Sequence, residues 1–146
     1  HKLTIMALGS DRSVVLDAQG QASICNALQT HITFEGIVFT NGQGTSGGAA
    51  YGERGLKFVN CLFEKNHASV HGGAVMGGRL MEFYKCDFVD NSAKFAGALR
   101  INDIGSAIIE DCVFFGNTAE NRGGALATQI EKPEEHSVTI KNTLFC

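Results

Sequence analysis

The sequence predicts an all-β protein, a right-handed parallel β-helix of about five to six coils. First, a Phe-x-x-Asn-x-Ala motif followed by Gly-Gly-Ala or a close variant recurs about every 25 residues, in 63–75, 88–99 and 114–126. Second, apolar residues recur in columns at the same period, and no sustained helical period is found. Third, 18 glycines and a single proline suit tight turns between short strands. Such repeats bury their apolar faces only against their neighbours, which defines a solenoid.

Three apolar columns define the predicted core. The Phe of the motif gives the first column, Phe39, Phe63, Phe88, Phe114 and Phe145, with spacings of 24, 25, 26 and 31 residues. Five residues earlier lies a second column, formed by Phe34, Phe58, Phe83, Ile109 and Ile140. Two residues before the Phe lies a third, formed by Ile37, Cys61, Cys86, Cys112 and Thr143. We expect all three columns to point inward.

Three turn columns separate the strands. The first two apolar columns have opposite parity along a strand, so a bend must lie between them. The residues at that bend are mostly turn-prone, namely Gly36, Asn60, Lys85, Asp111 and Asn142. A second turn holds Gly42, Asn66, Asn91 and Asn117, where Asn tolerates a left-handed backbone and can hydrogen-bond along a stack. The third turn holds Gly47-Gly48, Gly72-Gly73, Ala96-Gly97 and Gly123-Gly124, which indicates positive φ or close backbone approach.

Each repeat therefore has room for two or three strands of about 4 to 7 residues. Stacked repeats place equivalent strands in parallel, about 4.8 Å apart. We expect one domain over residues 1–146, with degenerate N-terminal coils in 1–33 and regular coils in 34–146. His1 is not an initiator residue and Cys146 follows Phe145 at the start of another motif, so we expect a fragment of a longer protein.

Composition narrows the function classes. A net charge of −3 argues against a nucleic-acid partner, and no apolar run is long enough for a membrane span in this segment. We expect no cofactor and no metal site, because His67 and His71 flank a turn, in what looks like an exposed loop, without a third ligand. Of the five cysteines, the three in the inward column are expected to be small buried free thiols. Cys25 and Cys146 lie off that column, and whether they form a disulfide stays open.

The repeat resembles that of the chlamydial polymorphic membrane proteins, a family of autotransported surface proteins. The matching pieces are Phe63 to Asn66 with Gly72 to Val75, Phe88 to Asn91 with Gly97 to Leu99, and Phe114 to Asn117 with Gly123 to Leu126. The resemblance covers about residues 34 to 146 and implies an autotransporter-like passenger segment, extracellular or on the cell surface, with adhesion as its role. The sequence departs from the pattern at Gly42, at Ala96 and in the insertion Glu131 to His136. Leu16 to Ala22 also looks like the early coils of pectate-lyase-like β-helices, which keeps an enzyme open.

Catalysis on polysaccharides needs clustered carboxylates on one outer face. One outward line of the main strand is Val38, Leu62, Asp87, Val113 and Leu144, and another is Glu35, Val59, Tyr84, Glu110 and Lys141. The acids of the second line lie three coils apart, about 14 Å. Asp87 and Asp90, with nearby Lys85, are the weak catalytic candidates that remain, and a solvated turn is the simpler interpretation of that cluster.

We therefore expect a non-catalytic extracellular or cell-surface module, either a structural stalk or an adhesin-type passenger segment. The alternative is a carbohydrate-active β-helix enzyme, a polysaccharide lyase, hydrolase or epimerase, whose catalytic groups lie on loops or outside this segment. The candidate contact face is the mostly apolar line Val38, Leu62, Asp87, Val113 and Leu144. Its expected partner is a host or neighbouring-cell surface protein or glycan. A flanking segment, coils of the same larger protein, or the loop Glu131 to His136 could instead cover it.

Overall fold

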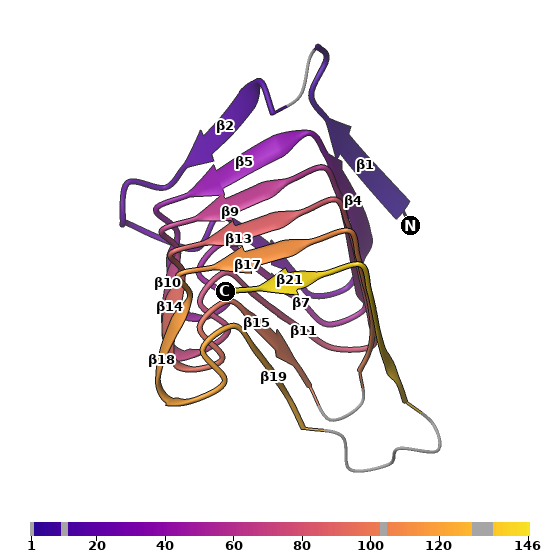
Figure 1. Cartoon of the computed structure of the whole chain (residues 1–146). Coiled ribbons are helices and arrows are strands. Elements are labelled where there is room, and N and C mark those ends of the chain that lie inside the picture. Colours follow the sequence, from indigo (N-terminus) through magenta and orange to yellow (C-terminus); the bar gives the residue numbers. More distant parts are fainter. Residues whose placement is uncertain (1, 10–11, 103–104, 130–135) are drawn as a thin grey trace.

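The computed structural model describes residues 2–9, 12–102, 105–129 and 136–146, and every regular element in them is a β-strand. The strands stack into a parallel solenoid with four sides (Figure 1), which confirms the predicted fold class. Two sides hold six strands, one holds five and one holds four. Of the insertion Glu131 to His136, residues 131–135 lie outside the described residues.

The four sheets follow one another around each regular coil in the order A, B, D, C, whereas the described part of the first coil has no strand in sheet D. Sheet A consists of β1 (Lys2–Met6), β4 (His31–Glu35), β8 (Gly55–Val59), β12 (Leu80–Tyr84), β16 (Ser106–Glu110) and β20 (Val138–Lys141). Sheet B consists of β2 (Val14–Asp17), β5 (Ile37–Thr40), β9 (Leu62–Glu64), β13 (Asp87–Val89), β17 (Val113–Phe115) and β21 (Leu144–Phe145). Sheet D consists of β6 (Gln43–Ser46), β10 (His67–His71), β14 (Ser92–Phe95) and β18 (Thr118–Arg122). Sheet C consists of β3 (Cys25–Ala27), β7 (Ala50–Gly52), β11 (Val75–Gly77), β15 (Leu99–Ile101) and β19 (Leu126–Thr128).

The regular coils hold four strands each, so the expectation of two or three was wrong. The segments on either side of the glycine pair each form a short strand, as β6 and β7 do in the first regular coil. These strands are only three to five residues long, and Gly, Ala and Ser stand beside their few β-branched and aromatic residues, so they give a weak strand signal in the sequence.

The aromatic columns form the core as predicted. Phe39 pairs in register with Phe63, Phe63 with Phe88, and Phe88 with Phe114, and these four rings are fully buried. Ring centroids along this column are 4.4 to 5.0 Å apart and nearly parallel. The second aromatic column stacks beside it with edge-to-face contacts between the two columns. Phe145 continues the first column but is 44% exposed, because it has a stacking neighbour on one side only.

The bend between sheets A and B consists of one residue with a left-handed backbone per coil. The φ values are 69° at Gly36, 51° at Asn60, 54° at Lys85, 55° at Asp111 and 46° at Asn142, at the bend that the parity argument predicts. The inward cysteine next to it donates its thiol to the carbonyl two residues earlier, as Cys112 does to Glu110 at 3.2 Å. Thr143 makes the equivalent bond with its hydroxyl, so this column closes the corner as well as filling the core.

The turn between sheets B and D carries a ladder of asparagines. Asn66 and Asn91 are fully buried, and each donates its amide to the carbonyl of the Phe 27 or 28 residues earlier, at 3.0 Å. The side-chain oxygen of Asn91 accepts from the backbone and the side chain of Asn66. The left-handed residue lies one position earlier, for example Lys65 at φ 54°, so the expected left-handed Asn was wrong while the ladder is confirmed.

Both explanations for the glycine pairs apply, one to each residue. The first residue has positive φ, 66° at Gly47, 61° at Gly72 and 59° at Ala96. The second lies against the next coil, because a β-carbon on Gly73 would overlap the carbonyl oxygen of Gly97. The described part of the chain contains no helix long and apolar enough to cross a membrane.

Candidate functional site

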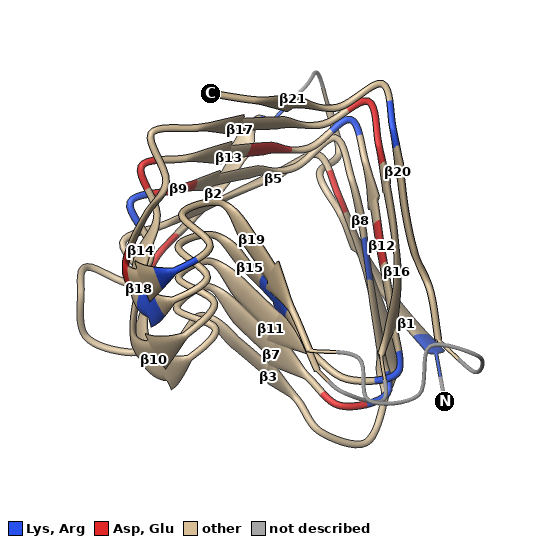
Figure 2. Cartoon of the chain, turned by 60° about the horizontal axis from the view of Figure 1, so that its bottom comes forward, with Lys and Arg blue, Asp and Glu red and all other residues tan. Residues whose placement is uncertain are grey.

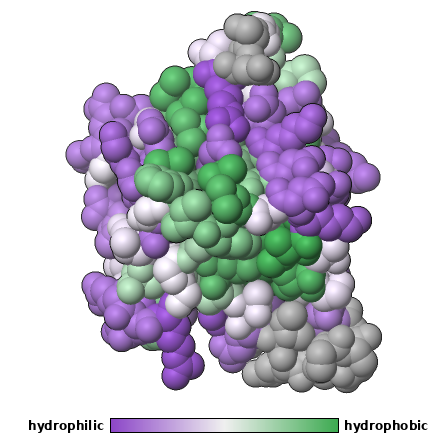
Figure 3. Space-filling view, viewed as in Figure 1, coloured by the Kyte–Doolittle hydropathy of each residue, from purple (hydrophilic) through white to green (hydrophobic). Residues whose placement is uncertain are grey.

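The predicted contact face lies on the outer surface of sheet B. Its members stand in one register, from Val38 through Leu62, Asp87 and Val113 to Leu144. We call this set the sheet B line. Val38 is 8% exposed and Leu144 is 57% exposed, and the members between them are half-buried. Apolar side chains gather over this face in the space-filling view (Figure 3).

Asp87 in the middle of the sheet B line is paired with Arg12. Arg12 lies in the connection between β1 and β2, and its Nη1 is 2.6 Å from Asp87 Oδ2. The same guanidinium donates to the carbonyl oxygens of Asn60 and Lys85 at the corner between sheets A and B. The β1–β2 connection therefore reaches the sheet B line, which the sequence did not suggest.

The weak catalytic candidates Asp87 and Asp90 are not arranged as a pair of free acids. Asp87 begins β13, whereas Asp90 follows β13 in the turn, with φ 52° and its carboxylate against Gly116 of the next coil. Lys85 lies at the opposite end of the strand, in the bend that precedes it. The three charged residues therefore do not form one cluster. Lys85 lies at the corner before β13, Asp87 lies on the strand, and Asp90 lies at the corner after it.

A second polar cluster lies on the outer face of sheet A; the sequence analysis placed its Tyr84 and Glu110 on one outward line but missed Glu82 and Lys57. Tyr84 pairs in register with Glu110, and Glu82 lies two residues before Tyr84 on the same face. The Tyr84 hydroxyl donates to Glu82 Oε1 at 3.1 Å, and Lys57 Nζ lies 5.1 Å from the centre of the Tyr84 ring. Burial, then the bond to Glu82 and the charges of Glu82 and Glu110, raise the pKa of Tyr84. These charges stand out on β8, β12 and β16 in Figure 2.

Beside this cluster the outer face of sheet A is hollowed. The hollow has a volume of about 380 Å³ and receives side chains from β1, β4, β8 and β12. Its polar lining residues are Lys2, Thr4, His31, Thr33, Lys57 and Glu82. Gly55 lies on its floor, where the imidazole of His31 covers the position that a β-carbon would occupy.

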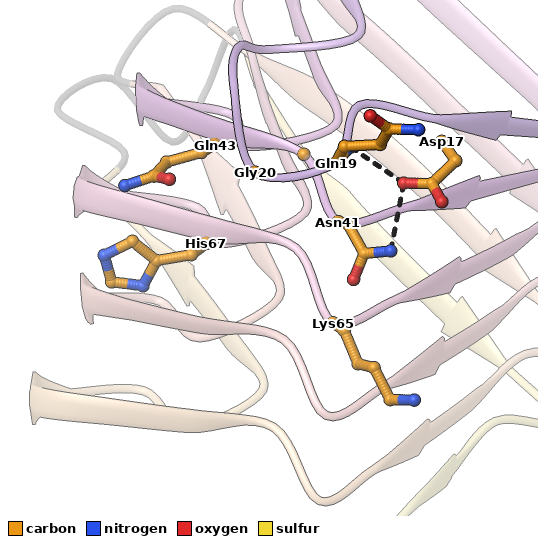
Figure 4. A pocket seen from close by; sticks show the side chains of 8 residues that line it. Asp17, Gln19, Gly20, Asn41, Gln43, Lys65 and His67 are labelled. Atoms are coloured by element: carbon orange, nitrogen blue, oxygen red, sulfur yellow. Dashed lines mark hydrogen bonds between the residues drawn. The ribbon is translucent and has the colours of Figure 1, made fainter.

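Another hollow, of about 470 Å³, lies at the corner between sheets B and D (Figure 4). Asp17 accepts hydrogen bonds from the Asn41 amide at 3.0 Å and the Gln19 backbone at 2.8 Å, which lower the pKa of its carboxyl. In Figure 4, Lys65 and His67 lie apart from each other and from the Asp17–Asn41 pair. The hollow is polar, and its lining residues include no Phe, Tyr or Trp and no acid besides Asp17.

The two histidines considered as metal ligands, His67 and His71, do not lie in an exposed loop as expected. They are the first and last residues of strand β10. His67 is exposed, and its Nδ1 lies 3.0 Å from Ser92 Oγ on the next coil. His71 is half-buried with its ring 5.3 Å from Phe95, and burial followed by the Arg100 charge lowers its pKa. Across the described residues, no three His, Cys, Asp or Glu side chains form a group that could hold a metal ion.

The five cysteines are free thiols in the structure. Cys61, Cys86 and Cys112 are buried in the predicted column, and burial raises the pKa of Cys86 well above its ordinary value. Its Sγ lies 3.4 Å from the carbonyl oxygen of Tyr84 and 3.5 Å from that of Phe58, so its one S–H can donate to either. Cys25 is half-buried and Cys146 is exposed, away from this column.

The geometry defines a parallel β-helix with polar clusters on its outer faces, and comparison with known families gives the same class. The chain belongs to the right-handed β-helix family, whose model matches residues 11–145. This match confirms the predicted hand of the solenoid. No curated protein and no solved structure matches the chain.

Proposed function

We propose that this chain is a non-catalytic β-helix module of an extracellular or cell-surface protein, a stiff segment that contacts a protein on another surface through the sheet B line. The observation that carries the proposal is the chemical character of the sheet B line. Its apolar members Leu62, Val113 and Leu144 are accessible, whereas Val38 is buried, and its one carboxylate, Asp87, is paired with Arg12. Apolar surface with a paired charge in its middle suits contact with a protein better than proton transfer.

The repeat supports the same role. The Phe columns, the Asn ladder and the glycine pairs are all used in stacking one coil on the next. Residues that pack one coil on the next make a solenoid stiff. Few residues of the repeat then remain available as catalytic groups. The resemblance of the repeat to the chlamydial polymorphic membrane proteins favours a surface location and a passenger or adhesin role.

Binding of the labelled chain to cultured epithelial cells tests the contact role. We expect Leu62→Lys and Val113→Lys to abolish cell binding, because a charge in the middle of the sheet B line would have to be desolvated on contact. Thr45→Lys, which adds the same charge at an exposed position of sheet D, is the matched control. Unchanged binding of both sheet B variants would contradict the proposal, and so would equal loss in the control.

A carbohydrate-active enzyme is the second candidate, and the cluster on sheet A favours it. Glu82 and Glu110 lie diagonally on neighbouring strands, about 8 Å apart between α-carbons from strand geometry. Catalysis on a glycosidic bond requires about 5 to 9.5 Å between the two carboxyl groups, a spacing that glutamate side chains can reach from these α-carbons. Glu82→Gln and Glu110→Gln are therefore the variants that separate this candidate from the first.

A further inference from the structure

We propose that the hollow on the outer face of sheet A binds a carboxylate-bearing sugar unit of an acidic polysaccharide, with Lys57 as the group that pairs with the carboxylate. The site is distinct from the sheet B line, and binding there requires no catalysis. The inference therefore does not depend on the role proposed above.

The charge of the hollow is the first argument. The chain as a whole carries a net charge of −3 with histidine counted as neutral, yet two lysines, Lys2 and Lys57, line this one hollow. The hollow has a single carboxylate, Glu82, which pairs in register with Lys57. One oxygen of Glu82 accepts the hydroxyl of Tyr84. Among the described residues, neither Lys2 nor Lys57 forms an ion pair with a carboxylate, whereas Arg12 does so with Asp87.

The position of Lys57 is the second argument. Its ammonium lies over the ring of Tyr84, 5.1 Å from the centre, and its side chain is half-buried. The ring reduces the freedom of the lysine side chain without neutralising its charge. A cation held in place in this way loses less conformational entropy when it binds an anion than a fully mobile surface lysine does.

The remaining lining matches a sugar rather than a bare anion. Thr4, Thr33 and Lys57 stand in one register on β1, β4 and β8, so hydroxyl and ammonium groups follow each other about every 4.8 Å along the stack. Leu80 adds an apolar surface, 39% exposed, at the end of the hollow. A sugar ring has hydroxyls at its edge and C–H groups on its faces, and a uronate adds a carboxylate. The volume of about 380 Å³ lies at the lower end of the range for small-ligand sites.

Tyr84 provides a direct optical probe. The chain has two tyrosines and no tryptophan, so in a Tyr51→Phe background all tyrosine fluorescence comes from Tyr84. We would titrate this variant with tetragalacturonate, with the neutral galactose tetrasaccharide and with inorganic phosphate, at low and at high salt. We expect a saturable fluorescence change with tetragalacturonate that weakens as salt rises.

Lys57→Gln in the same background should raise the Kd for tetragalacturonate about tenfold or more, because a charge-assisted hydrogen bond is lost. Lys94→Gln makes the same charge change on the exposed face of sheet D and should leave the Kd unchanged. The inference is overturned if tetragalacturonate does not bind, if the neutral sugar or phosphate binds as tightly, or if Lys57→Gln has no effect. Thermal unfolding of each variant is measured as a control. An unfolding temperature equal to that of the Tyr51→Phe background shows that a loss of binding does not come from a folding defect.

Discussion

Arg12 and Asp87 form an ion pair across 75 residues of sequence, with Nη1 of the arginine 2.6 Å from Oδ2 of the aspartate. Both side chains are partly accessible, at 24% and 32%. The pair joins the connection before β2 to strand β13, which belongs to a coil much further along the stack. It therefore holds an irregular segment of the first coil against a regular one.

Replacing either partner should leave the fold intact and loosen this segment. For Arg12→Met or Asp87→Asn we expect a loss of about 0.5 to 1 kcal/mol in the free energy of unfolding, because the pair is partly solvated. The loss should shrink in high salt. Urea titration at two salt concentrations measures it, with exposed Asp90→Asn as the control. A loss of similar size in that control would show that the effect is not specific to the pair.

The Phe column should dominate stability. Phe88 is fully buried, with rings stacked 4.8 Å from it on one side and 4.4 Å on the other. Phe88→Ala should therefore cost about 3 to 5 kcal/mol in the free energy of unfolding. Phe115, which is 56% exposed on the neighbouring coil, provides the control substitution to alanine. If denaturant titration gave a loss below about 1 kcal/mol for Phe88→Ala, the core assignment would be wrong.

The asparagine ladder should be sensitive to a single change. In Asn91→Ala the buried backbone N–H of Asn66 and the carbonyl of Phe63 lose their partners. We expect a loss of about 2 to 4 kcal/mol, because more than one buried polar group is left unsatisfied. Hydrogen exchange of the Asn66 amide should accelerate more than that of amides in sheet A. Thr118→Ala, at an exposed neighbouring position, should change neither quantity.

His71 should make stability depend on pH. Burial lowers its pKa in the folded state, so below about pH 6.5 the unfolded chain binds the proton more readily. The free energy of unfolding should therefore fall as the pH drops from about 6.5 through the lower folded-state pKa. His71→Gln should remove this part of the pH dependence, and His67→Gln should keep it. An identical pH profile for wild type and His71→Gln would contradict the assignment.

The inward columns and the corners could be predicted because they repeat at a fixed period. Phe63, Phe88 and Phe114 mark the core in the sequence, and the parity of the strands predicts the bends between sheets A and B, although not their left-handed backbone. The strands of sheets D and C were harder to predict, since they are only three to five residues long and interrupt their apolar residues with glycine, alanine and serine.

The candidate sites depend on residues outside the repeat. Glu82 lies on a third outward line, six residues before the Phe of its coil, so its diagonal relation to Glu110 appears only when the strands of sheet A are in register. Arg12 lies in an irregular connection, and no period in the sequence brings it to Asp87. Had all outward positions of β12 been considered, Glu82 would have been found and with it the polar cluster on sheet A. The ion pair of Arg12 and Asp87 would still have been missed.

The central claim is that this β-helix does not turn over a substrate. The most direct test is to incubate the purified chain with a panel of acidic and neutral polysaccharides and to follow unsaturated products and new reducing ends. We predict no turnover for wild type, Glu82→Gln, Glu110→Gln or Asp87→Ala. Turnover by wild type that any of these substitutions abolishes would contradict the claim and identify the chain as a carbohydrate-active enzyme.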